Sequence, residues 1–335
     1  MEKYHRPTII DIAREAGVSK ATVSRVLTHP EIVSEATKIR VQGVIDKYSY
    51  IPNLFAQSLN GAPSKMIGLI IDELSNFFFI EIAEGIDSIL GPQYYTMHLL
   101  SSRWVMEREN ELVKSLINSC VDGVLLAPVK PDSPAIKTLQ NSQIPFIVMN
   151  CIPDDETVSY VACDNIKGGT LAAQFINENR PEQVILITGF DDQSKQHRVE
   201  GFTATIHNEI PYFHYEAINT FEQGSHLVDQ ILLPKGLKHK KTTLFVTNDN
   251  VAIGVMNRLL ECGIKIPEQV SIIGYDDIRL ANLCRVPLTT ISQSSNLMGS
   301  IAARELLNLI DKGNNSCYKY LIEPSLVIRE STQKA

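Results

Sequence analysis

The chain has 335 residues, more than one ordinary domain needs and enough for two or three. No apolar run reaches the roughly 18 residues of a membrane span, and the first residues lack the apolar stretch of a signal peptide. We therefore expect a cytoplasmic protein without a membrane-spanning helix. The net charge of −7 is uneven, because residues 1–60 carry eight Lys or Arg and six Asp or Glu, whereas the remainder carries 23 and 32. A small basic head on an acidic body is compatible with a head that binds nucleic acid.

Three short helices are predicted within the first 48 residues. Thr8 and Asp11 have the spacing of a capping box, and Gly17 suits the left-handed residue that ends a helix. Ser19 and Ser34 are suited to cap the second and third helices. The apolar positions at helical spacing are Ile9, Ile12, Ala13 and Ala16, then Val23, Val26 and Leu27, then Ile39, Val41, Val44 and Ile45. Two short helices joined by a glycine-bearing turn are typical of a helix-turn-helix.

Strand-like apolar runs alternate with helical patterns from Met66 onward. The predicted strands are 66–71, 94–100, 121–127, 144–149, 183–189, 242–247 and 269–275, and the clearest predicted helices are 79–90, 104–119, 165–178, 195–208, 249–262 and 294–311. This alternation indicates parallel sheets with helices on both faces. Because the region is long for one doubly wound sheet, we predict two lobes with a cleft between them. Ligands of such folds bind beyond the carboxyl ends of the strands.

Sequence motifs for catalysis and metal binding are missing. The six cysteines (Cys120, Cys151, Cys163, Cys262, Cys284 and Cys317) form no CxxC pair and no Cys/His cluster at zinc spacing. The sequence also lacks a GxGxxG or phosphate-binding loop, a GxSxG elbow and an HExxH pair. We therefore expect reduced, buried thiols, no metal, no nucleotide cofactor and no enzymatic activity.

The run Asp11-Ile-Ala-x-x-Ala-Gly-Val-Ser-x-x-Thr-Val-Ser-Arg25, followed by Tyr50-Ile-Pro-Asn53, is the most specific pattern in the chain. It resembles the start of the lac repressor/galactose repressor family, and residues 8–60 fit without a gap. The resemblance implies three parts. They are an all-α helix-turn-helix DNA-binding domain (1–50), a hinge helix and linker (51–64), and a two-lobed α/β ligand-binding and dimerisation domain like the periplasmic binding proteins, with doubly wound parallel sheets (65–335).

The resemblance also implies DNA contacts. Lys20, Ala21 and Arg25 correspond to residues that face bases in the major groove. The positions that match phosphate contacts are Thr8, Ser19, Thr22, Ser24, Ser34, Thr37, Tyr50 and Asn53. Helix capping is the alternative role of the Ser and Thr residues, and both roles are compatible at a helix N-terminus. Residues 53–60 correspond to a hinge helix that forms on DNA, with Leu59 as the minor-groove wedge and Ala56 as the small residue that permits close approach.

The resemblance places seven residues around the cleft: Phe79, Asn150, Asp164, Arg198, Phe221, Asn248 and Asp276. Carboxylate, amide and guanidinium groups suit a ligand with several hydroxyls, and the phenylalanines offer faces to a sugar ring. Alternatives remain open, because an Arg–Asp pair is often structural, Phe79 and Phe221 also suit the core, and Asp164 also suits a helix cap. For Asn150 a ligand contact and a structural role both stay open, and Gln293 is a further candidate for a ligand contact.

Lys195 and His197 flank Arg198, and they either form a solvated helix face or favour an acidic effector such as a sugar acid or sugar phosphate. Trp104, the only tryptophan, lies at a predicted helix start, and we interpret it as a packing residue.

The expected function is a ligand-responsive transcription regulator of a sugar or sugar-acid operon, and we predict that it is a repressor. Its partners would be double-stranded DNA with a palindromic site, a small-molecule effector, and a second copy of the chain, since one small head makes few contacts. Two other classes stay open. One is a regulator driven by a phosphocarrier protein, with Arg304 as the hint. The other is a sugar-transport protein or enzyme of similar fold, against which residues 8–60 argue.

Overall fold

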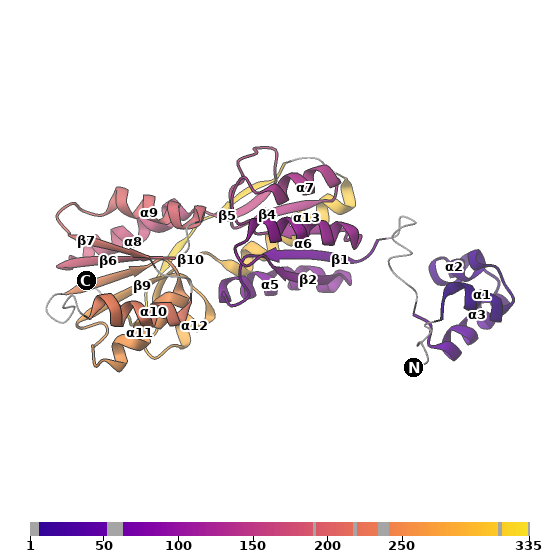
Figure 1. Ribbon diagram of the computed structural model, residues 1–335, viewed down its shortest axis with the longest axis horizontal. Helices are drawn as coiled ribbons and strands as arrows, with labels where there is room; N and C mark the ends of the chain where they lie inside the picture. Colours follow the sequence, from indigo (N-terminus) through magenta and orange to yellow (C-terminus); the bar gives the residue numbers. More distant parts are fainter. Residues whose placement is uncertain are drawn as a thin grey trace. The chain divides into compact units, whose positions relative to one another are not determined.

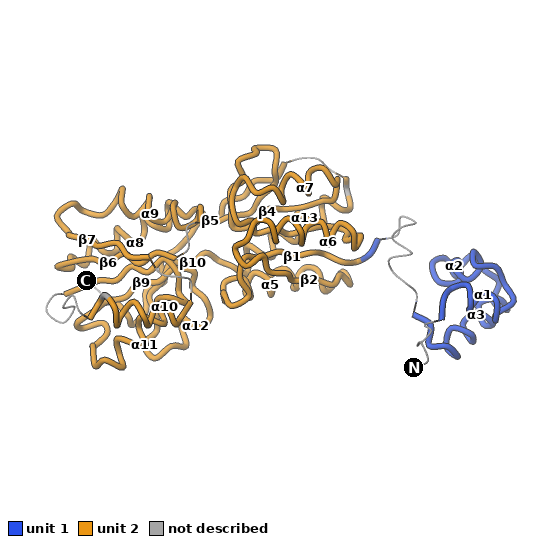
Figure 2. The backbone as a smooth tube through the Cα atoms, in the orientation of Figure 1, with its two compact units in different colours: residues 1–64 blue, residues 65–335 orange. Residues whose placement is uncertain are grey.

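The computed structural model describes residues 7–51, 63–189, 192–216, 220–233, 241–313 and 317–333. The chain divides into two compact units, residues 1–64 and residues 65–335 (Figure 2). The described ranges contain no helix long and apolar enough to cross a membrane. The predicted hinge-helix residues Asn53, Ala56 and Leu59 lie outside the described residues.

The first unit contains the three predicted helices, α1 (Ile9–Ala16), α2 (Lys20–Thr28) and α3 (Glu35–Tyr48). Both hydrogen bonds of the predicted capping box are present between Thr8 and Asp11. Gly17 has a φ of 62°, the left-handed conformation that glycine adopts at little cost. One small core joins the helices and includes Ile12, Val23, Val41 and Ile45.

Ile39 does not belong to that core, although its spacing favoured an apolar position. Its side chain is 68% exposed on α3. Helix α3 presents only one narrow apolar stripe to its two short partner helices, and Val41, Val44 and Ile45 already occupy that stripe.

The second unit has two lobes, each built on a six-stranded sheet (Figure 1). The first sheet has the order β11-β5-β4-β3-β1-β2 and is parallel throughout. Its strands are β1 (Met66–Ile71), β2 (Thr96–Ser101), β3 (Gly123–Leu126), β4 (Phe146–Met149), β5 (Tyr160–Cys163) and β11 (Lys319–Ile322). Helices α5 (Phe77–Leu90) and α13 (Ser295–Lys312) pack on one face, and α6 (Met106–Asn118) and α7 (Pro134–Ser142) on the other.

The second sheet repeats this arrangement in the order β12-β10-β9-β8-β6-β7. Its strands are β6 (Gln183–Thr188), β7 (Tyr212–Glu216), β8 (Thr242–Val246), β9 (Val270–Asp276), β10 (Thr289–Ser292) and β12 (Ser325–Val327), and only the β10–β12 pair is antiparallel. Helices α8 (Asn165–Asn179) and α9 (Gln193–Thr205) cover one face, and α10 (Phe221–Leu227) and α11 (Asp249–Glu261) the other. A short helix, α12 (Arg279–Leu283), follows β9.

The chain passes between the lobes three times, after β5, after β10 and after β11. In both sheets the strand order reverses beside the first strand of the lobe, β1 or β6. Ligands of doubly wound sheets bind at such reversals, outside the carboxyl ends of the strands. The fold predicted from the alternation of strands and helices is therefore present. The carboxyl ends of strands from both lobes lie at one cleft.

Candidate functional sites

The exposed face of α2 carries the residues predicted to read DNA. Val23 and Val26 are buried in the head, and this burial fixes the opposite face of the helix. Lys20, Ala21 and Arg25 are exposed, and Ser24 is exposed on the same face. The spacing of these four residues follows the helical period, so one side of α2 presents two cations, a methyl group and a hydroxyl to an incoming surface.

Two helix N-termini in the head carry paired hydroxyl groups. The Ser19 hydroxyl accepts from the backbone N–H of Thr22 at 3.1 Å, and the two side-chain oxygens lie 2.9 Å apart. Ser34 and Thr37 repeat this pair at the start of α3, again at 2.9 Å. Both capping and a role toward phosphate are compatible with this geometry, because a helix N-terminus and nearby hydroxyls suit an anion.

Thr8 and Tyr50 flank the three helices. Thr8 is exposed before α1, and Tyr50 packs half-buried against the head core after α3. Burial raises the pKa of the Tyr50 phenol, so its hydroxyl stays protonated and is able to donate a hydrogen bond.

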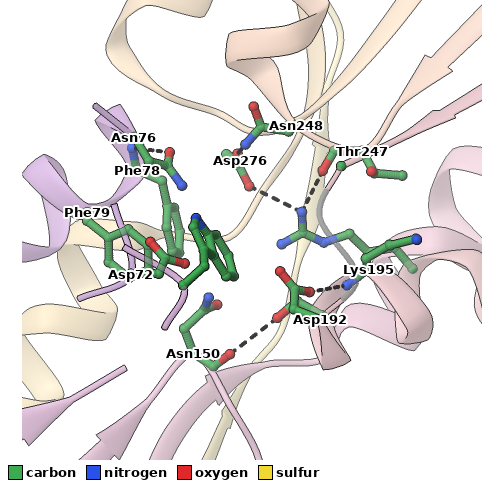
Figure 3. A pocket seen from close by; sticks show the side chains of 14 residues that line it. Asp72, Asn76, Phe78, Phe79, Asn150, Asp192, Lys195, Thr247, Asn248 and Asp276 are labelled. Carbon is green, nitrogen blue, oxygen red and sulfur yellow. Dashed lines mark hydrogen bonds and ion pairs between the residues drawn. The ribbon is translucent and has the colours of Figure 1, made fainter. Parts of the chain in front are cut away.

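A pocket lies between the lobes of the second unit, where strands from both sheets end (Figure 3). Asp72 follows β1, Asn150 follows β4, Thr247 follows β8, and Asp276 ends β9. The full lining consists of Asp72, Asn76, Phe78, Phe79, Trp104, Asn150, Gly189, Asp192, Ser194, Lys195, Arg198, Thr247, Asn248 and Asp276. Five of the seven residues predicted around the cleft belong to it.

Aromatic side chains of the first lobe form one side of the pocket. Phe78 and Phe79 are buried in the first turn of α5, with ring centroids 5.2 Å apart in an edge-on arrangement. Trp104 also lines the pocket, so its interpretation as packing alone was incomplete. It follows the carboxyl end of β2 and has a positive φ of 60°, as does its neighbour Arg103 at 53°. Its place after a strand was the signal that sequence reasoning missed.

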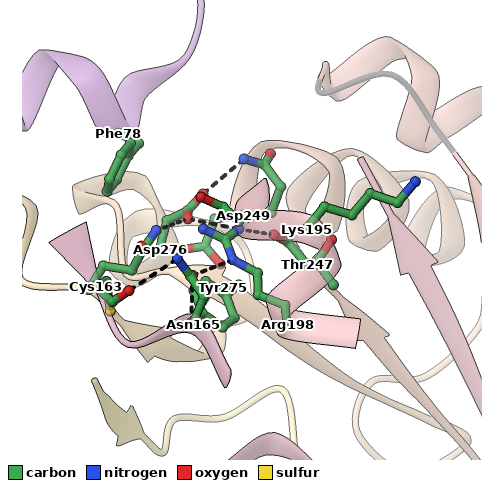
Figure 4. A network of polar contacts seen from close by, with 12 residues as sticks. Phe78, Cys163, Asn165, Lys195, Arg198, Thr247, Asp249, Tyr275 and Asp276 are labelled. Atoms are coloured by element: carbon green, nitrogen blue, oxygen red, sulfur yellow. Dashed lines mark hydrogen bonds and ion pairs between the residues drawn. The ribbon is translucent and has the colours of Figure 1, made fainter. Parts of the chain in front are cut away.

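Arg198 is held in a fixed position inside the second lobe (Figure 4). Its Nε donates to Asn165 Oδ1 at 2.8 Å, and its Nη1 donates to the Thr247 carbonyl at 2.6 Å. The guanidinium lies 3.8 Å from the centre of the Tyr275 ring, whose hydroxyl donates to the same Asn165 oxygen. These contacts use Nε and Nη1 and orient the guanidinium beside Asp276, with Nη1 3.6 Å from Oδ1.

Asp276 is the most constrained residue of the pocket. Its carboxylate accepts from Asn248 Nδ2 at 2.8 Å and from Gln293 Nε2 at 2.6 Å. Burial raises its pKa to about 7, although the charge of Arg198 acts in the opposite direction. Its φ of 120° is strained for a residue with a side chain, a cost on the order of 1–3 kcal/mol that is typically found at ligand sites.

Asp72 and Asn150 supply further acceptors from the first lobe. Burial, then the charge of Asp192, raise the pKa of Asp72 well above its ordinary value. Its Oδ1 accepts from the backbone N–H of Glu73 at 2.5 Å. The side-chain oxygen of Asn150 is buried without a hydrogen-bond partner. Sequence reasoning did not select Asp72, because an acidic residue after a buried strand is also common in loops.

Two of the predicted cleft residues lie outside this pocket lining. Asp164 caps α8 by accepting from the Lys167 backbone N–H at 2.9 Å. Phe221 begins α10 and packs edge-on against Phe77 of the other lobe, with centroids 6.1 Å apart. In this arrangement Asp164 has the helix-cap role left open above, and Phe221 packs against the core around the pocket.

The lobes are joined around the pocket by direct hydrogen bonds. The side chain of Gln193 accepts from the Ile152 backbone N–H at 2.8 Å and donates to its carbonyl at 3.0 Å. Ser194 donates to the Asn150 carbonyl at 3.2 Å. On another side, Arg279 donates its backbone N–H to Glu81 and its guanidinium to Glu84, both at 2.6 Å. These contacts define a closed arrangement that a ligand between the lobes would favour or oppose.

Comparisons with known proteins match segments of both units. Residues 8–53 match the family described as bacterial regulatory proteins, lacI family, and residues 173–332 match the periplasmic binding protein-like domain. The HTH-type transcriptional repressor PurR of Vibrio parahaemolyticus is 31% identical over 98% of this chain and 99% of its own length.

Two solved structures extend the comparison. A lac repressor dimer bound to operator and the anti-inducer ONPF has a TM-score of 0.80 and 25% identity, over 98% of this chain and all of that one. A LacI family regulator from Enterococcus faecalis with bound ribose has a TM-score of 0.70 and 31% identity, over 80% of this chain and 98% of that one.

The head and the two-lobed domain together define a DNA-binding regulator with a domain for a small effector, rather than an enzyme. The chain belongs to the lacI family of bacterial regulatory proteins, and it is a transcriptional repressor.

Proposed function

We propose that the chain binds a palindromic operator as a dimer and that a sugar or sugar derivative in the interlobe pocket sets its operator affinity in the cytoplasm. The observation that carries the effector class is the convergence of Arg198, Asn248 and Asp276 at the strand ends of the second lobe. Carboxylate, amide and guanidinium groups in fixed positions recognise hydroxyls by direction, as a sugar requires.

The aromatic side of the pocket supports the same class. Phe78, Phe79 and Trp104 line the pocket opposite the polar groups, and such rings pack against the C–H face of a sugar. The similar regulator from Enterococcus faecalis was solved with bound ribose. Aromatic rings also suit a flat base such as a purine, so a purine belongs in the test panel.

Lobe closure is the proposed link between the pocket and the operator. The effector contacts residues of both lobes, so it changes the relative stability of closed and open arrangements. A coupling of about 1–3 kcal/mol would change operator affinity roughly 5- to 150-fold. The direction of the change distinguishes an inducer, which weakens operator binding, from a corepressor, which strengthens it.

The test is an anisotropy titration of the purified full chain on its own upstream promoter DNA at fixed salt. The panel contains neutral sugars, amino sugars, sugar acids and purine bases, and sedimentation measures the oligomeric state. Specific binding to a palindrome that one sugar shifts supports the proposal. A shift caused only by a purine overturns the effector class. A response only to a phosphocarrier protein would instead assign control to a partner, with exposed Arg304 on α13 as a first residue to test.

A further inference from the structure

The pocket contains an excess of hydrogen-bond acceptors on its first-lobe side. Asp72 is 7% exposed at the end of β1. Its hydrogen bond comes from the backbone of Glu73, and no side chain in the described ranges forms an ion pair with it. A buried carboxylate without a cation is costly, and this cost normally leads to protonation or to binding of a donor.

The two cationic side chains of the pocket already have carboxylate neighbours. Arg198 lies 3.6 Å from Asp276 and also donates to Asn165 and to a backbone carbonyl. The Lys195 amine donates to Glu216 at 2.9 Å. Neither interaction reaches Asp72. The described pocket therefore offers more negative than positive charge to a ligand.

Asn150 adds an acceptor at the same place. Its Oδ1 is buried and has no hydrogen-bond partner. The residue has a positive φ of 55°, and Ser194 of the other lobe donates to its carbonyl. A buried amide oxygen without a donor is costly, and a ligand that donates to it would remove this cost.

Asp192 brings a second carboxylate from the opposite lobe. It caps α9 by accepting from the backbone N–H of Lys195 at 2.7 Å, and Figure 3 shows it across the pocket from Asp72. Its charge contributes to the raised pKa of Asp72. In this arrangement of the lobes the two acidic side chains line the same pocket, and a cation between them would stabilise it.

We propose that the effector carries a protonated amine, as an amino sugar does, and that its ammonium group lies between Asp72 and Asp192 and donates to Asn150. This inference rests on the proposed function, because it assigns the chemical class of the sugar derivative. An ammonium group supplies three donors and one positive charge, which match the acceptors of this side of the pocket. The ring hydroxyls would then face Asn248, Asp276 and Arg198.

The same observations oppose the acidic effector considered from Lys195 and His197. A carboxylate or phosphate would meet the buried carboxyl group of Asp72, and of the two cationic side chains in the pocket Lys195 already pairs with Glu216 and Arg198 lies beside Asp276. An acidic sugar is therefore a competing outcome that the experiment must measure directly.

The experiment is isothermal titration of the full chain at pH 7 with matched ligands. Glucosamine, galactosamine and mannosamine are compared with their parent hydroxyl sugars, their N-acetyl forms, the corresponding acids and hypoxanthine. One amine should bind about 10- to 100-fold more tightly than its parent and N-acetyl form, the effect of one charged hydrogen bond in a buried site. Its binding should also release protons to the buffer, because the ammonium needs ionised Asp72.

Asp72→Asn tests the residue and keeps the size of the side chain. It should reduce the preference for the amine about tenfold or more and abolish the proton release. Glu200→Gln is the matched control, because it removes one negative charge from the exposed face of α9, and it should change neither quantity. The melting temperature of each variant without ligand shows that it is folded.

The outcomes separate the two proposals. Equal binding of an amine and its neutral parent, tighter binding of an acid, or an unchanged preference in Asp72→Asn overturns the ammonium site, while the sugar effector stands. Binding of hypoxanthine with no response to any sugar overturns the sugar effector itself, and the ammonium site with it.

Discussion

The candidate functional residues of the head are exposed to solvent, whereas those of the interlobe pocket are buried. In the head, Lys20, Ala21 and Arg25 are exposed on one helix, and the core lies beneath them. In the pocket, Arg198 and Asp276 are buried and hydrogen-bonded to residues from other strands and helices. Residues predicted to read DNA can therefore change without disturbing the fold, whereas residues proposed to bind the effector also hold the lobe together.

We therefore expect substitutions of these head residues to change binding without changing stability, and substitutions in the pocket to change both. Substitutions in the exposed face of α2 should change DNA affinity at constant stability. Substitutions in the buried network should change stability and ligand response together, because the same hydrogen bonds serve both. The following predictions test that separation from the largest expected effect to the smallest.

Arg198→Met should destabilise the second unit by about 3 kcal/mol and abolish the ligand response. The substitution leaves Asn165 and the Thr247 carbonyl without their donor and leaves Asp276 without its neighbouring cation. Urea denaturation of the full chain measures the loss. Arg304→Met is the control, because Arg304 is exposed on α13 and should tolerate the change. A stable Arg198→Met protein that merely fails to bind ligand would contradict the shared role of the network.

The stability of the second unit should fall as pH rises from about 4 to 7. Burial raises the pKa of Asp276 to about 7, so in this window the folded protein holds a proton that the unfolded chain has released. Asp72 and Asp249 have pKa values raised in the same direction. His214 acts oppositely, because burial lowers its pKa and favours folding above its ordinary range.

The measurement is the melting temperature across this window for the native chain and for Asp276→Asn. The difference between the two isolates one carboxylate and cancels the contribution of His214. Asp276→Asn should flatten the profile, whereas Asp155→Asn should leave it unchanged in this window, since the Asp155 pKa is about 2. Parallel profiles for the native chain and Asp276→Asn would contradict a proton held at Asp276.

The same contrast explains how far the sequence predicts the molecule. The head was predictable helix by helix, because Thr8, Gly17 and Ser19 act on backbone within a few residues. Seven strands, β1 to β4, β6, β8 and β9, were also predicted from their apolar runs, whereas the short strands β5, β10, β11 and β12 were not. Strand β7 was not, because it lies at a sheet edge and its residues Tyr212 and Phe213 are exposed, so no apolar run marks it.

The pocket was only partly predictable, because its members meet through the fold. Strand ends indicated Asn248 and Asp276. Trp104 also follows a strand, but it was predicted to begin a helix, and a turn with positive φ places it in the pocket. Asn165 and Tyr275 meet Arg198 from two other elements, and no spacing in the sequence reports that contact. The periodicity of apolar residues predicts helices and strands, but it does not predict which residues of distant segments come into contact.

Arg25→Ala should weaken specific operator binding by about 1–3 kcal/mol, roughly 5- to 150-fold, with no change in melting temperature. Its side chain is exposed on α2 beside Lys20 and Ala21, so the head loses no core contact. Anisotropy titrations compare the native operator with a scrambled duplex. Arg40→Ala removes an exposed charge from α3 and should preserve the preference for operator. An equal loss of affinity on both duplexes in Arg25→Ala would assign Arg25 to the phosphate backbone instead.

Thr8→Ala should destabilise α1 locally by about 1 kcal/mol, the smallest of these effects. The Thr8 hydroxyl lies 3.4 Å from the Asp11 backbone N–H and 2.7 Å from the Asp11 carboxylate, and the carboxylate accepts the Thr8 backbone N–H at 2.9 Å. Faster hydrogen exchange over residues 9–16 in the full chain measures the loss, and Thr8→Ser should preserve the native rate because serine keeps the hydroxyl.

The predicted phosphate contact of Thr8 adds a second consequence. If the hydroxyl serves both roles, Thr8→Ala should also weaken operator and scrambled DNA equally, since a phosphate contact carries no sequence preference. Faster exchange with unchanged DNA affinity would make Thr8 a cap alone. It would also show that exposed head residues, like buried pocket residues, contribute to stability wherever they close a hydrogen bond with the backbone.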